Sequence, residues 1–243
     1  MKDERPDPKP RKHPQLWQAY CAWTELVDVR KRHTLRLSAI ERGKSNYDAE
    51  WERRWLEDTR LDTSIANTLK EMATWGEMTG PIWPWLNGIK GIGPSLAAQL
   101  LAQIDDVGKF DTISKLWRFA GWAVIDGQAE RNQRGEKSHY NAKLKSVCWL
   151  CIDSFIKQQT PGYIDIYYAE KERQRDLHPE KIKVNGKCQF NDGHIDNRAR
   201  RKVAKIFLQH VWIKWREFEG LPISKPWVID VAGHTHYVEP GTV

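Results

Sequence analysis

Apolar residues recur at helical spacing along most of the chain, and this periodicity predicts a mainly α fold. The first such stretch covers about residues 15–43. Its apolar stripe consists of Leu16, Tyr20, Trp23 and Val27. A second stretch, about 47–75, has an apolar side with one break in phase. Because the turn Gly43–Asn46 combines helix-stop and N-cap residues, the two stretches predict a long antiparallel helical hairpin.

Glycine and proline residues interrupt this pattern after the second stretch, and a compact helical region follows from Trp83 to Trp122. Periodicity is then lost over 125–141, which predicts a basic loop or a short β-hairpin. Between there and the tail, three more helices are predicted, at about 142–158, 163–176 and 196–218. Before the last of them, Asn185-Gly186 carries the signal of a two-residue hairpin turn.

The same pattern divides the chain into four parts. Residues 1–14 are rich in proline and charge and predict a disordered arm, whereas residues 220–243 predict an extended tail. The helical hairpin occupies 15–79, and a second helical domain occupies 80–219. The hairpin has two interpretations: it packs on the core of its own chain, or it is a coiled coil that forms a homodimer.

The segment Trp85–Leu101 carries the most specific pattern in the chain. It predicts a short helix, a turn in which glycines flank an apolar residue, and a second helix. Gly91 and Gly93 permit positive φ and the close approach of a phosphate, and Pro94 suits a first helical turn. Ala97 is small, so the two helices can cross closely. We therefore expect a helix-hairpin-helix within the second domain.

A helix-hairpin-helix predicts a site for the phosphates of DNA or RNA. The free N–H groups at the start of a helix point toward an anion, and the helix dipole adds to the attraction. Such contacts do not read base sequence. The candidate residues are Lys90, Gly91, Ile92, Gly93 and Ser95. The alternative is a tight turn between core helices that touches no nucleic acid.

Charge extends this hypothesis to two further surfaces. The chain of 243 residues has a formal net charge of +7 and a pI near 9.2, which suits an acidic partner. One face of the last predicted helix, with few acidic neighbours in sequence, carries Arg198, Arg201, Lys202 and Lys205. The loop after residue 125 and the helix that follows supply Arg131, Arg134, Lys137, Lys143 and Lys145. We expect both sets to contact phosphates, although charge runs are often only solvated faces.

Cysteine and histidine residues predict no metal centre. Cys148 and Cys151 have CxxC spacing but lie in an apolar helical run, which favours two core cysteines. A zinc site from His178, Cys188 and His194 would lack a fourth ligand and matches no known finger spacing. We expect binding to require no cofactor.

Composition also bears on location. Four cysteines without regular spacing in a chain of this length indicate a reduced, intracellular protein. The N-terminal segment lacks the apolar core of a signal peptide, and no stretch reaches the ~18 apolar residues of a membrane span. We expect a cytoplasmic protein, associated with the nucleoid or with a phage-infected host, and no membrane contact.

Several segments match one protein family in their order and spacing. They are Leu26–Leu37, Leu86–Ile104, Leu116–Gly121, Tyr140–Lys145 and Arg198–Leu208. In this order they resemble five parts of the C-terminal half of transposases of the insertion-sequence 110/116/902 family. Those parts are the coiled coil, the helix-hairpin-helix, a helix with an Ala-Gly end, a Gly-Asn-x-x-Leu-Arg segment and a final basic helix.

The resemblance implies DNA recombination, guided in at least some members by a structured RNA. The family's enzymes have metal-binding acidic residues in an N-terminal RuvC-like domain and a serine, usually as Ser-Gly, in the loop after the Ala-Gly end. Only about 25 residues precede the first matching segment here, too few for such a domain. Asp126-Gly127 stands where Ser-Gly is expected, and Ser138 lies too close to Asn141 to fit the family spacing.

We therefore expect a transposase-derived protein that binds DNA, or a structured RNA, and is not an enzyme by itself. Two alternatives stay open. One is an active serine-dependent recombinase that uses Ser138 and Mg²⁺. The other is a structural or inhibitory protein that binds another protein.

Overall fold

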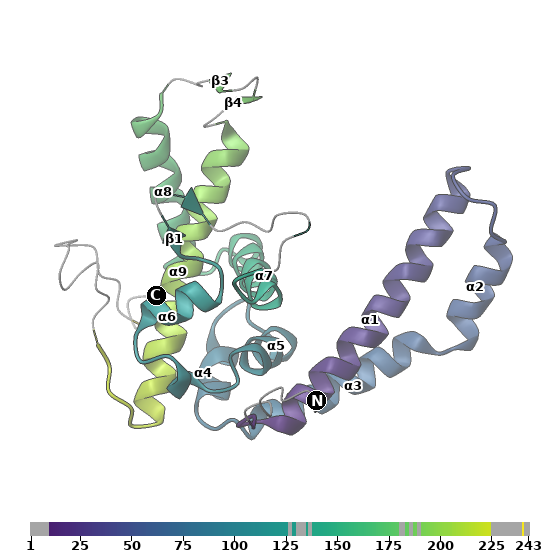
Figure 1. Ribbon diagram of the computed structural model, residues 1–243, viewed down its shortest axis with the longest axis horizontal. Coiled ribbons are helices and arrows are strands. Elements are labelled where there is room, and N and C mark those ends of the chain that lie inside the picture. The colour runs from purple at the N-terminus through teal and green to yellow at the C-terminus, as the bar shows by residue number, and fades with distance from the viewer. Residues whose placement is uncertain are drawn as a thin grey trace, which may run out of the picture. The chain divides into compact units, whose positions relative to one another are not determined.

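The computed structural model describes residues 10–125, 128–129, 135, 138–179, 183–184, 187–188, 191–224 and 240. These residues are mainly helical, which confirms the predicted fold class (Figure 1). The chain divides into two compact units, Met1–Thr79 and Gly80–Val243, and each is described by itself. Most of the predicted N-terminal arm and of the predicted tail lies outside the described residues.

The first unit contains a long helix, α1 (Pro14–Glu41), against which α2 (Ala49–Asp58) and α3 (Leu61–Glu77) pack. The sequence predicted a single second helix over 47–75, and that prediction is wrong. Arg60 adopts a left-handed conformation (φ 47°) between α2 and α3, so the chain changes direction there.

The break at Arg60 accounts for the phase break in the apolar pattern. α2 keeps its own contact with α1, in which the ring of Trp55 stacks on that of His33 with centroids 3.7 Å apart. The buried carboxylate of Glu52 lies 2.6 Å from Nδ1 of His33. Two helices with independent phases can each turn an apolar side toward α1, which one straight helix could not do. Dimerisation of this unit stays a prediction.

The second unit is built around its longest described helix, α9. Its α-helices are α4 (Ile82–Gly88), α5 (Pro94–Ile104), α6 (Ile113–Phe119), α7 (Ala142–Gln158), α8 (Tyr163–Leu177) and α9 (Asp192–Phe218). A short 3₁₀ helix, η1, spans Val107–Lys109. Helix α9 packs against α4, α6, α7 and α8 (Figure 1), and its Phe207, Trp212 and Trp215 are buried. The unit therefore has one core with α9 through its middle.

Core side chains fasten the loops of this unit by donating hydrogen bonds to loop carbonyls. Nε1 of Trp212 donates to the carbonyl of Phe110 at 2.7 Å. The buried guanidinium of Arg216 donates to the same carbonyl at 3.1 Å and to that of Pro222 at 2.7 Å. Residues before α6 and after α9 are thus held at one end of α9.

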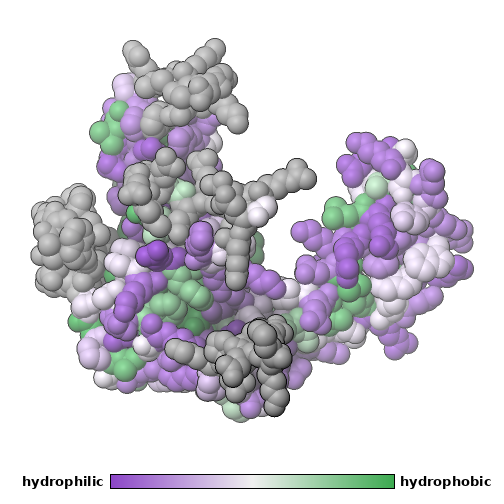
Figure 2. Space-filling model, viewed as in Figure 1, coloured by the Kyte–Doolittle hydropathy of each residue, from purple (hydrophilic) through white to green (hydrophobic). Residues whose placement is uncertain are grey.

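Two short ladders complete the unit. β1 (Val124–Ile125) pairs with β2 (Gln128–Ala129), and β3 (Lys183–Val184) pairs with β4 (Lys187–Cys188), both antiparallel. They agree with the short hairpins predicted at these places, whose turn residues lie outside the described ones. On the face drawn in Figure 2, hydrophilic residues cover most of the coloured surface. No helix among the described residues is long and apolar enough to cross a membrane.

Charged side chains join α8 to α9. Glu170 on α8 is 3% exposed, accepts a hydrogen bond from Lys202 of α9 at 2.9 Å, and also pairs with Arg173. Burial by itself would raise the pKa of Glu170, but the hydrogen bonds from Arg173, Lys202 and Gln174 outweigh it and lower the pKa to about 2. The carboxylate form of Glu170 therefore favours the packed helices.

The loop between α6 and α7 is closed at its base. Gly121 has a φ of +69°, and a Cβ atom built on it would lie 2.7 Å from Cγ of Tyr140. Next to this contact, the amide of Asn141 donates to the carbonyl of Phe119 at 2.7 Å. Only glycine fits both the backbone conformation and the space under the Tyr140 ring.

Gly121→Ala should therefore destabilise the second unit more than the same change at a glycine with similar φ and open surroundings. Gly220→Ala is the matched control, because its φ is +65° and nothing lies within 4 Å of an added Cβ. We expect the control to lower the free energy of unfolding by about 1–2 kcal/mol. Gly121→Ala should lower the free energy of unfolding by a further amount of about 1–3 kcal/mol, because the added methyl group overpacks the space under Tyr140. Equal losses in denaturant titrations would show that Tyr140 yields at no cost.

Glu170→Gln should lower stability in a way that depends on pH. Because the folded-state pKa of Glu170 is depressed to about 2, its contribution is complete above its ordinary pKa of 4.5 and is lost as the pH falls toward 2. The difference in the free energy of unfolding between wild type and variant should shrink over that window. A difference that stays constant from neutral pH to about pH 2 would contradict this ionic role.

Candidate nucleic-acid interface

Helices α4 and α5 are joined by a tight turn, residues 89–93. Gly91 has a φ of +93°, as the sequence predicted for a turn glycine. The amide of Ile92 donates to the carbonyl of Ile89 at 2.9 Å, and the Ile92 side chain is 3% exposed. Ile92 thus anchors the turn in the core, whereas Ile89 is half-buried. Ala97 is fully buried, in keeping with the expected close crossing of the two helices.

Helix α5 begins without a side-chain cap. Gly93 is its N-cap residue, Pro94 is the first residue, and the first turn contains no acidic residue. The amide of Ala97 donates to the carbonyl of Gly93 at 3.1 Å. Among the described residues, no acceptor is found for the amides of Gly93, Ser95 and Leu96. Three adjacent donors therefore stand at the positive end of the helix dipole.

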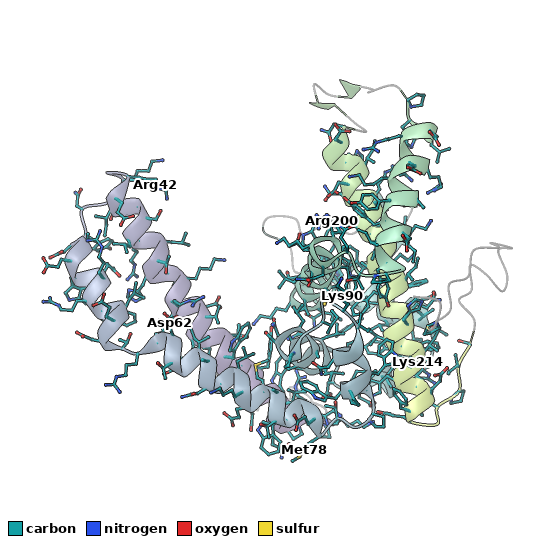
Figure 3. All side chains as sticks on the ribbon, turned by 180° about the vertical axis from the view of Figure 1, so that it is seen from behind. Arg42, Asp62, Met78, Lys90, Arg200 and Lys214 are labelled. Atoms are coloured by element: carbon teal, nitrogen blue, oxygen red, sulfur yellow. The ribbon has the colours of Figure 1, made fainter. Side chains whose placement is uncertain are left out.

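The space in front of these donors is open. A Cβ atom added to Gly93 would meet nothing within 4 Å, although the residue has an ordinary extended conformation (φ −95°, ψ 175°). Lys90, which lies in the turn itself, is exposed (Figure 3). The turn therefore brings together Lys90, Gly91, Ile92, Gly93 and Ser95, the five candidates predicted from sequence in this segment.

The other side of the turn is held by the segment at the end of α7. The hydroxyl of Ser154 donates to the carbonyl of Gly91 at 2.7 Å, and the hydroxyl of Thr160 donates to that of Lys90 at 2.8 Å. Neither residue was predicted from the sequence. No local signal identifies them, because they lie more than 60 positions away from the turn they contact.

The basic set around the α6–α7 loop is only partly described. Arg131, Arg134 and Lys137 lie outside the described residues. Lys143 is exposed on α7, whereas Nζ of Lys145 lies over the Tyr140 ring, 4.4 Å from its centroid.

Ser138, the low-priority catalytic candidate, is exposed. Its hydroxyl donates to the carbonyl of Tyr140 at 2.9 Å. The hydroxyl thus closes a local turn at the end of the loop.

The basic stripe on α9 differs from expectation. The expectation from sequence that the stripe lacks acidic partners is wrong for Lys202, because α8 lies along the same face and supplies Glu170. Arg198 donates from Nη1 to Oε1 of Gln174, also on α8, at 2.8 Å. Arg200, nearby, pairs with Asp196 at 2.7 Å (Figure 3). The sequence of one helix cannot predict acidic residues that a neighbouring helix brings to its surface.

Among the described residues, Lys205, at the C-terminal end of the stripe, is held by an aromatic ring and not by an acidic residue. Nζ of Lys205 lies over the ring of Trp117, 4.2 Å from its centroid, and Nε1 of Trp117 donates to the Lys205 carbonyl. Burial, and next the positive charge of Arg201, lower the pKa of Lys205. Arg201 is half-buried. Phosphate contacts by Arg198, Arg201, Lys202 and Lys205 stay a prediction. Within the fold, Arg198, Lys202 and Lys205 already have partners that would compete with a phosphate.

Cys148 and Cys151 lie in the core, as their place in an apolar helical run predicted. Cys148 and Cys151 are fully buried, and burial raises the pKa of Cys148 to about 12, so the pair behaves as core residues. Among the described residues, no group of three histidine, cysteine or acidic side chains could hold a metal ion. The side chain of Cys188, between His178 and His194, is outside the described part.

Comparison with known proteins bears on this region. Residues 84–168 match the model of the Transposase IS116/IS110/IS902 family. No curated protein and no solved structure matches the chain. The matched segment begins in α4, contains the turn and α5, and ends in α8, so it includes both the open amides and the hydroxyls of Ser154 and Thr160. Residues 84–168 are thus similar to this transposase family, which confirms, over these residues, the resemblance found in the sequence.

Proposed function

We propose that this protein, derived from a transposase, binds duplex DNA by gripping backbone phosphates at the turn 89–93 and the first turn of α5. The observation that carries the proposal is the set of open amides of Gly93, Ser95 and Leu96 at an uncapped helix N-terminus. The segment that contains them matches a family of DNA transposases. In this role the turn is a helix-hairpin-helix.

The chemistry of the turn suits a phosphate diester. Its unesterified oxygens accept hydrogen bonds, and N–H donors with a helix dipole behind them favour a negative charge. Lys90 adds a positive charge beside the amides. Since backbone amides and a lysine contact only phosphate oxygens, binding should tolerate any base sequence.

The α9 stripe has a secondary part in this proposal. Arg198 and Lys202 hold α8 in place through Gln174 and Glu170. We assign them a structural role together with a contribution to the positive potential, since the bonds to α8 hold these half-buried side chains in place and limit their reach toward a phosphate.

Binding without strand transfer is the activity proposed for the chain alone. The Ser138 hydroxyl donates to a neighbouring carbonyl, and no described carboxylate or imidazole is hydrogen-bonded to it. A serine nucleophile needs such a base or a bound metal to become reactive.

Gly93→Ala should weaken DNA binding while leaving the fold intact. The added methyl group meets no atom of the protein but occupies the space through which a phosphate would approach. We expect a fall in duplex affinity of about tenfold or more, corresponding to one charge-assisted hydrogen bond. Stability should change by less than about 1 kcal/mol.

Gly88→Ala is the matched control for this experiment, because its Cβ also meets nothing within 4 Å but it lies on α4, before the turn. Its affinity should equal that of wild type in fluorescence anisotropy with a short duplex. If Gly93→Ala also binds as wild type does, the turn is structural only and the proposal fails.

Lys90→Ala should lower the salt dependence of binding. Each phosphate contact by a cation contributes roughly one unit to the slope of log affinity against log salt concentration. We therefore expect the slope to decrease by about one for Lys90→Ala. Lys70→Ala, which removes an exposed lysine of α3 in the first unit, controls for net charge. Equal slopes for the two variants would remove Lys90 from the interface.

A further inference from the structure

Two hydroxyl groups from outside the turn reach its two successive carbonyls. Thr160 donates to the carbonyl of Lys90 at 2.8 Å, and Ser154 donates to that of Gly91 at 2.7 Å. The hydroxyls leave little room for a side chain at position 91, because an added Cβ atom would lie 3.1 Å from Oγ of Ser154 and 3.4 Å from Oγ1 of Thr160. Together with its φ of +93°, this close approach favours glycine at position 91.

The donors are themselves held firmly. Ser154 lies on α7, and Thr160 follows it in the connection to α8, where it is 3% exposed. Gln159 adopts a left-handed conformation (φ 50°), which ends α7 and turns the chain back. The amide of Thr160 then donates to the carbonyl of Phe155 at 3.0 Å. The backbone of Thr160 is therefore fixed before its hydroxyl reaches the turn.

The direction of a carbonyl decides the direction of the next amide. In a trans peptide the C=O of one residue and the N–H of the next point in opposite directions. Thr160 draws the carbonyl of Lys90 inward, so the N–H of Gly91 points away from Thr160. Glycine permits this peptide to rotate more easily than any other residue would. If it rotated, an electronegative oxygen would replace a donor on that side.

We propose that Thr160 and Ser154 are positioning residues that keep the carbonyls of the turn on its inner side, and that Thr160 thereby keeps the Gly91 amide on the phosphate side. The inference rests on the proposed function of the turn. It adds that the site depends on hydroxyl groups from the α7–α8 connection, which do not touch the nucleic acid.

Thr160→Val tests the inference, because it keeps the shape of the side chain and removes the donor. We expect duplex affinity to fall about three- to tenfold, as for one hydrogen bond. Thr160→Ser, which keeps the hydroxyl, should restore most of the affinity. Ser154→Ala should act in the same direction as Thr160→Val. Ser146→Ala is the control on α7, because that exposed hydroxyl donates only to Ala142 of its own helix.

Amide spectra of protein labelled with ¹⁵N-glycine separate positioning from general loss of stability. In wild type, titration with a short duplex should shift the signals of both Gly91 and Gly93. In Thr160→Val the Gly91 signal should move already in the free protein and respond less to DNA, while Gly93 still responds. A variant that was merely less stable would retain both responses at a temperature at which it is folded.

The outcomes distinguish phosphate binding by the turn from the positioning role of Thr160 and Ser154. If Gly93→Ala lowers duplex affinity but Thr160→Val and Ser154→Ala bind the duplex like wild type, the turn binds phosphate and the positioning role is wrong. If neither glycine signal responds to DNA in wild type, the proposed function itself fails. A loss of affinity in Thr160→Val that Thr160→Ser does not restore would also overturn the positioning role.

Discussion

A buried carbonyl oxygen must accept a hydrogen bond, and this requirement organises the second unit of the protein. Burying such a group without a partner costs on the order of 1–3 kcal/mol. Loops cannot supply the partner from a regular ladder, so side chains of the core do so. Trp212 and Arg216 donate to the carbonyl of Phe110, and Ser154 donates to that of Gly91. The loops of the unit are therefore fixed by donors that come from distant helices.

The same requirement makes the turn between α4 and α5 asymmetric. Its carbonyls at Lys90 and Gly91 are satisfied from inside, which turns them away from solvent. The amides at the start of α5 find no acceptor among the described residues, because the N-cap residue Gly93 has no side chain and the first turn contains no acidic residue. A helix end with its acceptors inward and its donors outward favours an anion over a cation, and this polarity is the physical basis of the proposed phosphate site.

Local patterns in the sequence were sufficient for most of the helices and for the turn. Periodicity placed α7 and α9, and Gly91, Gly93 and Pro94 identified the turn because each constrains the backbone at its own position. The left-handed break at Arg60 was missed, since arginine carries no signal for that conformation and only the packing against α1 requires it. Thr160 was missed for a related reason: its role depends on a contact with Lys90, which is distant in sequence.

Charge is the property that a linear sequence represents least well. In the sequence, Lys202 belongs to a run of basic residues and is expected to be an available cation, whereas Lys90 is a single lysine between apolar residues. In the folded unit the order is reversed, because Glu170 of α8 neutralises Lys202, whereas Lys90 stands exposed beside open amides. Coulomb attraction depends on distance in space, and an ion pair already formed with a neighbouring helix competes with any phosphate. An isolated lysine next to donors that have no acceptor therefore points to a phosphate site more specifically than a longer run of basic residues whose partners lie on the next helix.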